Sequence, residues 1–292
     1  MAAAGRRSGP EPVVLEVRYA HRRNRLSVAF RLILVVPQVV VVYGLGIASF
    51  VVAVLGWFGA LILGRLPRWV AEFQANALAW YARVHAYGLL LVDSYPPFRW
   101  YQDEAYPVRL RLDPGRLNRG AVLFRLILGI PAYVVSVLAI TGAEVVSVVV
   151  WVILVVSGRM PRPLFQAMVS GLRYYVRFAA YGYLLLTATY PTGLFEEPLL
   201  LGRWPDGEEL PQEGSSAGHA TTTSWPPASW SVASVPLGGA AKWLVALLIV
   251  VGAVAQGAVV ANDLGSHPRR LTRPNPGVQV AMVRPALEEA DP

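Results

Sequence analysis

Three arginines and one glutamate are the residues whose types and positions could do chemistry in this chain. Arg83 and Arg177 occupy equivalent positions in two similar stretches of sequence, and Arg173 lies one helical turn before Arg177. A guanidinium group makes forked hydrogen bonds to phosphate oxygens, so these side chains could bind lipid phosphates or line a polar path between the two stretches. The alternative is a stripe of arginines that faces water or lipid headgroups from an interfacial helix.

Glu144 lies near the middle of a long apolar run, where the first of the two similar stretches has Phe50. An ionisable group at that depth in a membrane is costly unless it is paired or faces water. Glu144 could therefore be a carboxylate in a polar cavity, paired with Arg173 or Arg177. The alternative is a glutamate near the surface at a break in the helix.

The other polar residues form no recognisable catalytic or metal-binding motif. The chain has no cysteine, and its four histidines show no metal-ligand spacing. It has no P-loop and no nucleophile elbow, and Gly44 to Ser49 lacks the preceding strand and the last glycine of a dinucleotide fingerprint. The sequence therefore predicts no catalytic, cofactor-binding or metal-binding residue, and we expect a protein that is not an enzyme.

Composition places these residues in a membrane protein. Of the 292 residues 55% are hydrophobic and only 15% are charged, and the mean hydropathy is +0.45. The formal net charge is +8, and Lys242 is the only lysine. Arginines that flank membrane segments on the cytoplasmic side explain most of this charge, so nucleic acid is not an expected partner.

An internal repeat organises the chain. NRLSVAFRLILVVP at residues 24–37 returns as NRGAVLFRLILGIP at residues 118–131, with nine of the fourteen aligned residues identical. The similarity continues through units of about 90 residues. Alternation of apolar and polar residues predicts a short strand in each unit, and the two strands could pair. Each unit is thus expected to hold a strand (Pro12–Tyr19; Pro107–Asp113), an apolar run (Phe30–Leu63; Phe124–Val156) and a second helix (Arg68–Asp93; Pro163–Thr189).

Each apolar run ends in a similar way. Trp57 and Trp151 precede the ends of the two runs, and both runs close with a Gly-Arg-x-Pro-Arg motif that contains Arg65 or Arg159. The glycine can stop one helix and the proline can start the next. Tryptophan followed by arginine is typical of an anchor at the water interface, so these four residues are expected to be interface anchors.

The fold class expected from these patterns is mainly α and integral to the membrane. Two tandem units of a strand plus two helices are followed by one C-terminal transmembrane helix. The divisions are a disordered N-terminus (1–11), the first membrane unit (12–98), a connector (99–106), the second membrane unit (107–198), a polar Pro/Ser/Thr-rich linker (199–240), the C-terminal transmembrane helix (241–262) and a basic, mostly disordered tail (263–292).

The apolar runs are too long for a simple upright crossing. A straight helix of 34 residues is roughly 51 Å long, against a hydrocarbon core of about 30 Å. One solution turns each run at Pro37 or Pro131 and gives five crossings. The other is a shallow hairpin that bends near 44–46 and 141–144. Arginines on both sides of each run favour the hairpin, whereas unsatisfied backbone groups in lipid count against it.

Four segments resemble a known family: Phe30-Arg31-Leu32 through Pro37, Gly64–Pro67, Arg83–Tyr87 and Tyr95–Phe98, each with a counterpart in the second unit. They resemble actinobacterial membrane proteins that carry domain of unknown function 4389, over roughly residues 12–198. The resemblance implies a multi-pass plasma-membrane protein and brings no activity or cofactor. Asp93 is a departure from the repeat, because the second unit has no acidic residue there.

The function expected from these observations is that of a non-enzymatic scaffold or accessory membrane subunit. A transporter or channel-like bundle is an alternative, because many transport folds are built from internal repeats. A lipid-headgroup-binding or lipid-modifying protein is another. Membrane lipids are the expected partners, and the small-residue spacing Ala253, Gly257, Ala261 could pack the last span against another helix or support a homo-oligomer or a partner membrane protein.

Overall fold

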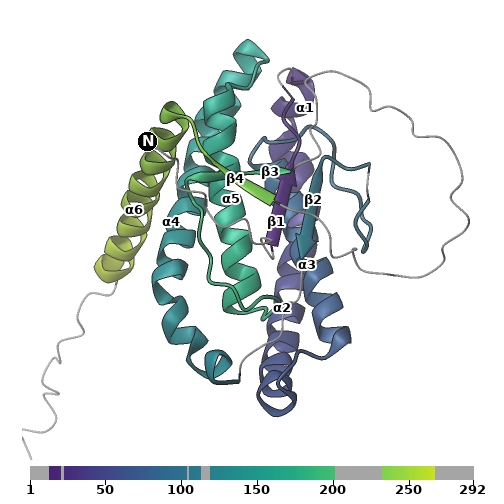
Figure 1. The fold of residues 1–292 in the computed structure, drawn as a ribbon. Helices are drawn as coiled ribbons and strands as arrows, with labels where there is room; N and C mark the ends of the chain where they lie inside the picture. The colour runs from purple at the N-terminus through teal and green to yellow at the C-terminus, as the bar shows by residue number, and fades with distance from the viewer. Residues whose placement is uncertain (1–12, 21–22, 104, 113–118, 201–231, 267–292) are drawn as a thin grey trace, which may run out of the picture.

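Both copies of the repeat fold into a short strand, a long apolar helix and a shorter second helix (Figure 1). The computed structural model describes residues 13–20, 23–103, 105–112, 119–200 and 232–266. The predicted element types are confirmed in both units. The first unit holds β1 (Val13–Val17), α1 (Arg25–Ala29), α2 (Arg31–Leu63) and α3 (Arg68–Gly88), and the second holds β2 (Val108–Leu112), α4 (Arg119–Ser157) and α5 (Arg162–Gly182).

The two long helices continue through the prolines at which a turn was expected. Pro37 lies inside α2, and Pro131 lies inside α4. Neither proline ends its helix, and the hairpin bend predicted near 44–46 and 141–144 is wrong because both segments are helical throughout. An unbroken helix satisfies its backbone groups internally, which an apolar surrounding favours. The break in the first unit instead lies at Phe30, between α1 and α2, where φ is −90° and ψ is 3°.

Glycines end the long helices as predicted. Gly64 and Gly158 have φ values of 69° and 66°, and their N–H groups donate to Ala60 and Leu154, respectively. Proline then occupies the N-cap of the following helix in both units, at Pro67 in the first. The left-handed conformation favours glycine because a Cβ is strained there.

The second helices end earlier than predicted. The expected ends were Asp93 and Thr189, but α3 stops at Gly88 and α5 at Gly182. Leu90, with φ 65°, takes the left-handed position, and the Leu91 N–H donates to the Ala86 carbonyl at 2.9 Å. This closure is a Schellman motif with leucine in the position that glycine usually fills. Leucine at this position gives no sequence signal for a helix end, and the prolines further on predict a later one.

A pseudo-twofold axis relates the two units. β1 and β2 pair antiparallel with Leu15 opposite Leu110 at the centre of the register, and these leucines are themselves equivalent residues of the two units. The equivalent Tyr81 and Tyr175 stack on each other with ring centroids 5.2 Å apart. α3 packs against β2, whereas α5 packs against β1. Each unit therefore completes the core of the other.

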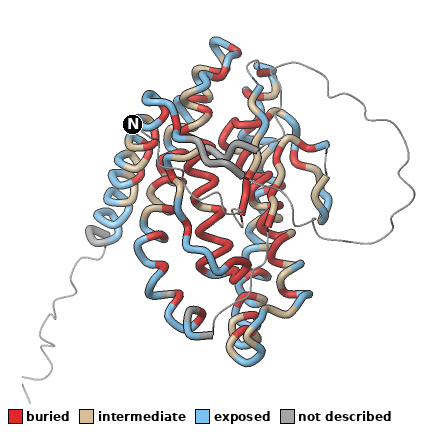
Figure 2. Tube along the Cα trace, viewed as in Figure 1, coloured by how far each residue is buried: buried red, intermediate tan, exposed pale blue. Residues whose placement is uncertain are grey.

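The second helices lie inside the molecule, and the apolar helices lie outside it (Figure 2). Three helical segments are long and apolar enough to cross a membrane: Arg31–Leu63, Val122–Ser157 and Gly239–Asp263. The described parts of α3 and α5 are not among them, because buried arginines and amides lower their hydropathy. The five-crossing prediction also counts α3 and α5, whereas the described residues hold three helices that are long and apolar enough to cross.

The last helix, α6 (Gly239–Ser266), packs along α4. The close crossing uses glycines: a Cβ on Gly142 would lie 1.8 Å from the Leu248 carbonyl oxygen, and one on Gly252 would lie 2.0 Å from that of Leu138. The expected small-residue stripe is wrong as the packing surface within this chain, because Ala253, Gly257 and Ala261 are exposed. Helix contact runs through Gly252, which lies on a different side of α6.

A second antiparallel pair precedes α6. β3 (Glu196–Leu200) pairs with β4 (Val232–Pro236), so the described ends of the region predicted to be a polar linker (199–240) include strand residues. The remainder of that region, residues 201–231, lies outside the described residues. So do the predicted disordered N-terminus (1–11) and nearly all of the predicted tail (263–292).

Candidate functional site

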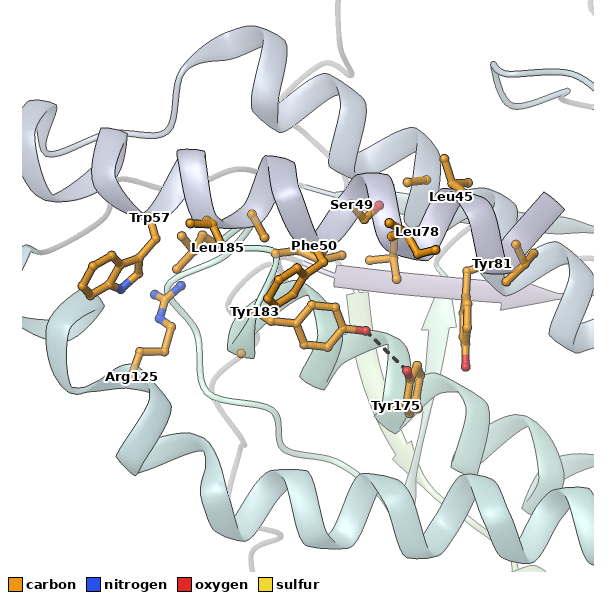
Figure 3. Close-up of a pocket in the computed structure, with 18 of the residues that line it drawn as sticks. Leu45, Ser49, Phe50, Trp57, Leu78, Tyr81, Arg125, Tyr175, Tyr183 and Leu185 are labelled. Atoms are coloured by element: carbon orange, nitrogen blue, oxygen red, sulfur yellow. Dashed lines mark hydrogen bonds between the residues drawn. The ribbon is translucent and has the colours of Figure 1, made fainter. Parts of the chain in front are cut away.

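A groove of about 920 Å³ lies between the two units, with α2 along one side and the start of α4 at one end (Figure 3). That volume falls within the range of small-molecule and cofactor sites. Tyr175 and Tyr183 lie on the wall opposite α2, with their hydroxyl oxygens 3.4 Å apart. The lining residues are Val42, Tyr43, Leu45, Gly46, Ile47, Ser49, Phe50, Ala53, Val54, Trp57 and Phe58 of α2; Ala77, Leu78 and Tyr81 of α3; Val122 and Arg125 of α4; and Tyr175, Gly182, Tyr183, Leu184 and Leu185 at the end of α5.

Arg125 is the charged residue among those that line the groove. Its side chain extends from the first turns of α4 toward α2, between Trp57 and Leu185 (Figure 3). It belongs to a buried stripe at helical spacing, together with Val122 and Gly129. Only 1% of Arg125 is exposed to solvent. The fold therefore holds a cation at one end of an apolar groove.

The guanidinium of Arg125 is held from one side. Its Nη1 donates to the Tyr181 carbonyl at 3.1 Å, and its carbon lies 4.6 Å from the centroid of the Tyr181 ring. Tyr181 is in the last turn of α5, where helix carbonyls lack intrahelical partners and a cation is favoured. Among the described residues, Nε and Nη2 of Arg125 have no hydrogen-bond partner.

Arg31 is the equivalent residue of the first unit, and it differs in one partner. It lies over the Tyr87 ring at 4.5 Å and donates to the Tyr87 carbonyl at 3.5 Å. Its Nη2 also lies 2.8 Å from Oδ1 of Asp93. Arg23 approaches the same carboxylate at 3.9 Å, and burial lowers the pKa of Arg23 while Asp93 raises it. In the first unit, therefore, Asp93 of the same unit balances the charge of Arg31.

The second unit has no acid at the corresponding position. Leu90 and Leu185 are the left-handed residues after α3 and α5, so counting three residues onward from each aligns Asp93 with Ala188. No acidic side chain of the described residues forms an ion pair with Arg125. The two arginines therefore share a position in the fold but not a charge balance.

The three arginines singled out from the sequence bind the protein's own backbone. Arg83 donates to the carbonyls of Arg99 and Tyr101. Arg173 donates to those of Leu15 and Glu196, and Arg177 to those of Val13 and Thr192. All three are buried, so a water- or headgroup-facing stripe is wrong. These contacts fasten loops and β1 to the helices, and they use donors that a lipid phosphate would need.

Glu144 is exposed on α4. The expected pairing with Arg173 or Arg177 is wrong, since no ion pair joins Glu144 to either arginine within the described part of the chain. No helix break accompanies it either, because α4 continues through this position. The arginines are turned toward β1 and the loops, on the other side of α5.

The expected interface anchors fall into two groups. Trp57 donates to the Val122 carbonyl at 3.4 Å, and Trp151 donates to the Val28 carbonyl at 2.9 Å. Val28 and Val122 are equivalent residues, so each unit holds the start of the other through its tryptophan. Whether these rings also lie at a membrane boundary stays a prediction. Arg65 and Arg159 are exposed, in the turns that follow α2 and α4.

Sequence reasoning missed Arg125 as a site residue, although two signals pointed to it. It lies in the most strongly repeated segment of the chain, and Asp93 of the first unit has no acidic counterpart in the second. The link between them required the fold, because Arg31 and Asp93 are far apart in the sequence. No group of three or more His, Asp or Glu residues within the described ranges could hold a metal ion.

Comparison with protein families matches the chain twice to a single domain of unknown function (DUF4389), at residues 25–99 and 119–194. These segments correspond to α1 through the loop after α3, and to α4 through the loop after α5. Neither curated proteins nor solved structures gave a match. Since the two segments cover more than half of its length, the chain belongs to the DUF4389 family and carries the domain in two tandem copies.

Proposed function

We propose that this protein is a non-enzymatic, multi-pass plasma-membrane protein that binds a lipid chain in the groove between its two units. The groove itself is the observation that carries this proposal. Its walls are almost entirely aliphatic and aromatic, and it is bounded by α2, one of the three helices apolar enough to cross a membrane. A ligand that fills it must bury apolar surface, as an acyl chain does.

The surroundings of the groove favour lipid over a water-soluble ligand. Large apolar side chains remain exposed along both long helices, among them Phe50 and Phe58 on α2 and Val148 on α4. Apolar patches of this extent mark surfaces that contact membranes or partners. A lipid chain already in the bilayer could enter the groove sideways without crossing water.

A pair of glycines on α2 offers a matched test. Gly46 lines the groove, whereas Gly44 does not, and a Cβ at either would meet nothing within 4 Å. Gly46→Trp should fill the groove and reduce the lipid that co-purifies with the protein, measured by native mass spectrometry after detergent exchange. Gly44→Trp should leave it unchanged. Equal lipid retention by both variants would remove the groove as the site.

The multi-pass arrangement has its own test. The turn after α2 and the turn after α4 lie at opposite ends of the bundle (Figure 1), so upright helices put Arg65 and Arg159 on opposite sides of the membrane. The chain has no native cysteine, so Arg65→Cys and Arg159→Cys can each be labelled with a membrane-impermeant thiol reagent in intact cells. Labelling of only one supports the crossing, and equal labelling of both contradicts it.

A transporter is the second candidate, favoured by one observation. The reciprocal tryptophan contacts join the end of each long helix to the start of the other unit, so α2 and α4 run antiparallel. Inverted repeats with a site between them are common among secondary transporters. Solute flux into proteoliposomes separates the two candidates, since a lipid-binding module should show none above that of empty vesicles.

A further inference from the structure

We propose that Arg125 makes the groove selective for a lipid whose headgroup carries an anionic phosphate. This inference rests on the proposed function and names the class of ligand. The groove holds the chain of such a lipid, and the guanidinium at its end binds the phosphate.

The free edge of the guanidinium carries the argument. Nε and Nη2 are the two nitrogens without a partner among the described residues, and they lie on the same edge of the planar group. That edge presents two parallel N–H donors, the geometry that binds two oxygens of a phosphate. Nη1, on the far side, is already used by the Tyr181 carbonyl, so the side chain is fixed with its fork buried and unpaired.

Burial makes an empty fork costly. Arg125 is 1% exposed, and a buried cation without an anion is strongly unfavourable in an apolar surrounding. The aromatic ring of Tyr181 offsets part of this cost. An anion bound beside Arg125 offsets the remaining cost of the buried charge. Binding of an anionic headgroup should therefore depend on Arg125.

The first unit shows what the second lacks. Asp93 places a carboxylate 2.8 Å from Nη2 of Arg31, whereas the residue aligned with it in the second unit is Ala188. In the first unit the carboxylate of Asp93 pairs with the arginine. In the second unit the phosphate of a bound lipid can take the corresponding position beside Arg125. Only the second arginine lines the groove, so one phosphate is expected per chain.

The test compares two lipids with identical acyl chains on the full-length protein. Phosphatidylglycerol and diacylglycerol are added separately to the delipidated protein in detergent, and bound lipid is measured by native mass spectrometry. Wild-type protein should retain phosphatidylglycerol about tenfold more strongly. Arg125→Gln should lose that preference and still bind both lipids. Ala188→Asp, which adds an acid where Asp93 stands in the first unit, should lose it as well.

The controls separate the ways in which the idea could fail. Arg162→Gln removes an exposed arginine at the start of α5 and should keep the preference. Inorganic phosphate alone should neither bind at millimolar concentration nor displace the lipid, because only the acyl chain of the lipid makes the apolar contacts in the groove. An unchanged preference in Arg125→Gln, with Gly46→Trp still blocking both lipids, would overturn the phosphate site and leave the groove standing. Equal binding of both lipids to Gly46→Trp and wild type would instead overturn the groove.

Discussion

The two units differ most where their sequences agree most closely. Arg31 and Arg125 stand in the same repeated segment and lie on equivalent tyrosine rings, but Asp93 pairs with the first arginine alone. An identical residue is therefore part of a closed internal network in one unit and lines a groove in the other. The comparison teaches that two copies with the same fold can differ in a single acidic position, and that this position decides whether the buried arginine has an internal partner.

Removal of Asp93 should make the first unit resemble the second, and we expect it to have the largest effect on stability. Asp93→Ala leaves Arg23 and Arg31 buried without their shared carboxylate. We expect a loss of about 3 kcal/mol in the free energy of unfolding, at the low end for a buried ion pair because 29% of the Asp93 side chain is exposed. Thermal unfolding in detergent measures it. A variant as stable as the wild type would mean that the first arginine does not need its acid.

The C-terminal helix covers only the second unit, and its glycines allow a test of that asymmetry. Gly252→Leu places a side chain against the α4 backbone and should cost about 1–3 kcal/mol by overpacking. Gly257→Leu is the control, because nothing lies within 4 Å of a Cβ there. The readout is cross-linking by a short bis-maleimide reagent between cysteines placed at Thr141 and Gln256, whose Oγ1 and Nε2 atoms are 3.0 Å apart. Equal cross-linking in both variants would show that the contact between α4 and α6 accepts a larger side chain at Gly252.

The paired tryptophans sharpen the comparison on a smaller scale. Trp151→Phe and Trp57→Phe each remove one hydrogen bond between the units, at 2.9 and 3.4 Å respectively. We expect a loss near 1 kcal/mol for Trp151→Phe and less for Trp57→Phe, because the shorter bond is the stronger. Chemical denaturation of both variants gives the difference. A larger loss of stability from Trp57→Phe than from Trp151→Phe would contradict this ranking of the two hydrogen bonds.

The smallest effect is expected at the paired strands. Glu16 and Arg111 are equivalent residues that differ in charge, and they form an ion pair at 3.0 Å across the sheet. Burial raises the pKa of Glu16 above 4.5, although Arg111 and Arg109 lower it. The folded state therefore holds the proton more tightly, so stability falls as pH rises from 4.5 toward the folded pKa. Glu16→Gln should remove this slope and change the free energy of unfolding by less than about 1 kcal/mol near neutral pH.

Local patterns were enough to predict much of the fold. Alternation predicted β1 and β2, hydropathy predicted the long helices, and the glycines of the closing motifs marked their ends. The end of α3 was missed because the position after it is left-handed with leucine instead of glycine, so the usual signal is absent. The continuation of α2 through Pro37 was missed because a proline inside a helix can bend it without ending it.

The candidate site was harder to predict because it depends on contacts between distant segments. Arg83, Arg173 and Arg177 drew attention by their stripe, yet their donors reach carbonyls in loops and in β1 that no helical wheel contains. Arg125 is defined by what is missing beside it. A missing partner can be recognised only once α4, α5 and the loop after α5 are assembled.

The exchange of partners between strands and helices has a consequence for what one unit could do alone. Because α3 packs on the strand of the second unit and α5 on the strand of the first, a lone unit would leave the apolar face of its own strand uncovered. Two identical copies could cover each other, but both arginine sites would then be the same. Within a single polypeptide one unit can carry an acid beside its arginine and the other can lack it, which no pair of identical subunits can do.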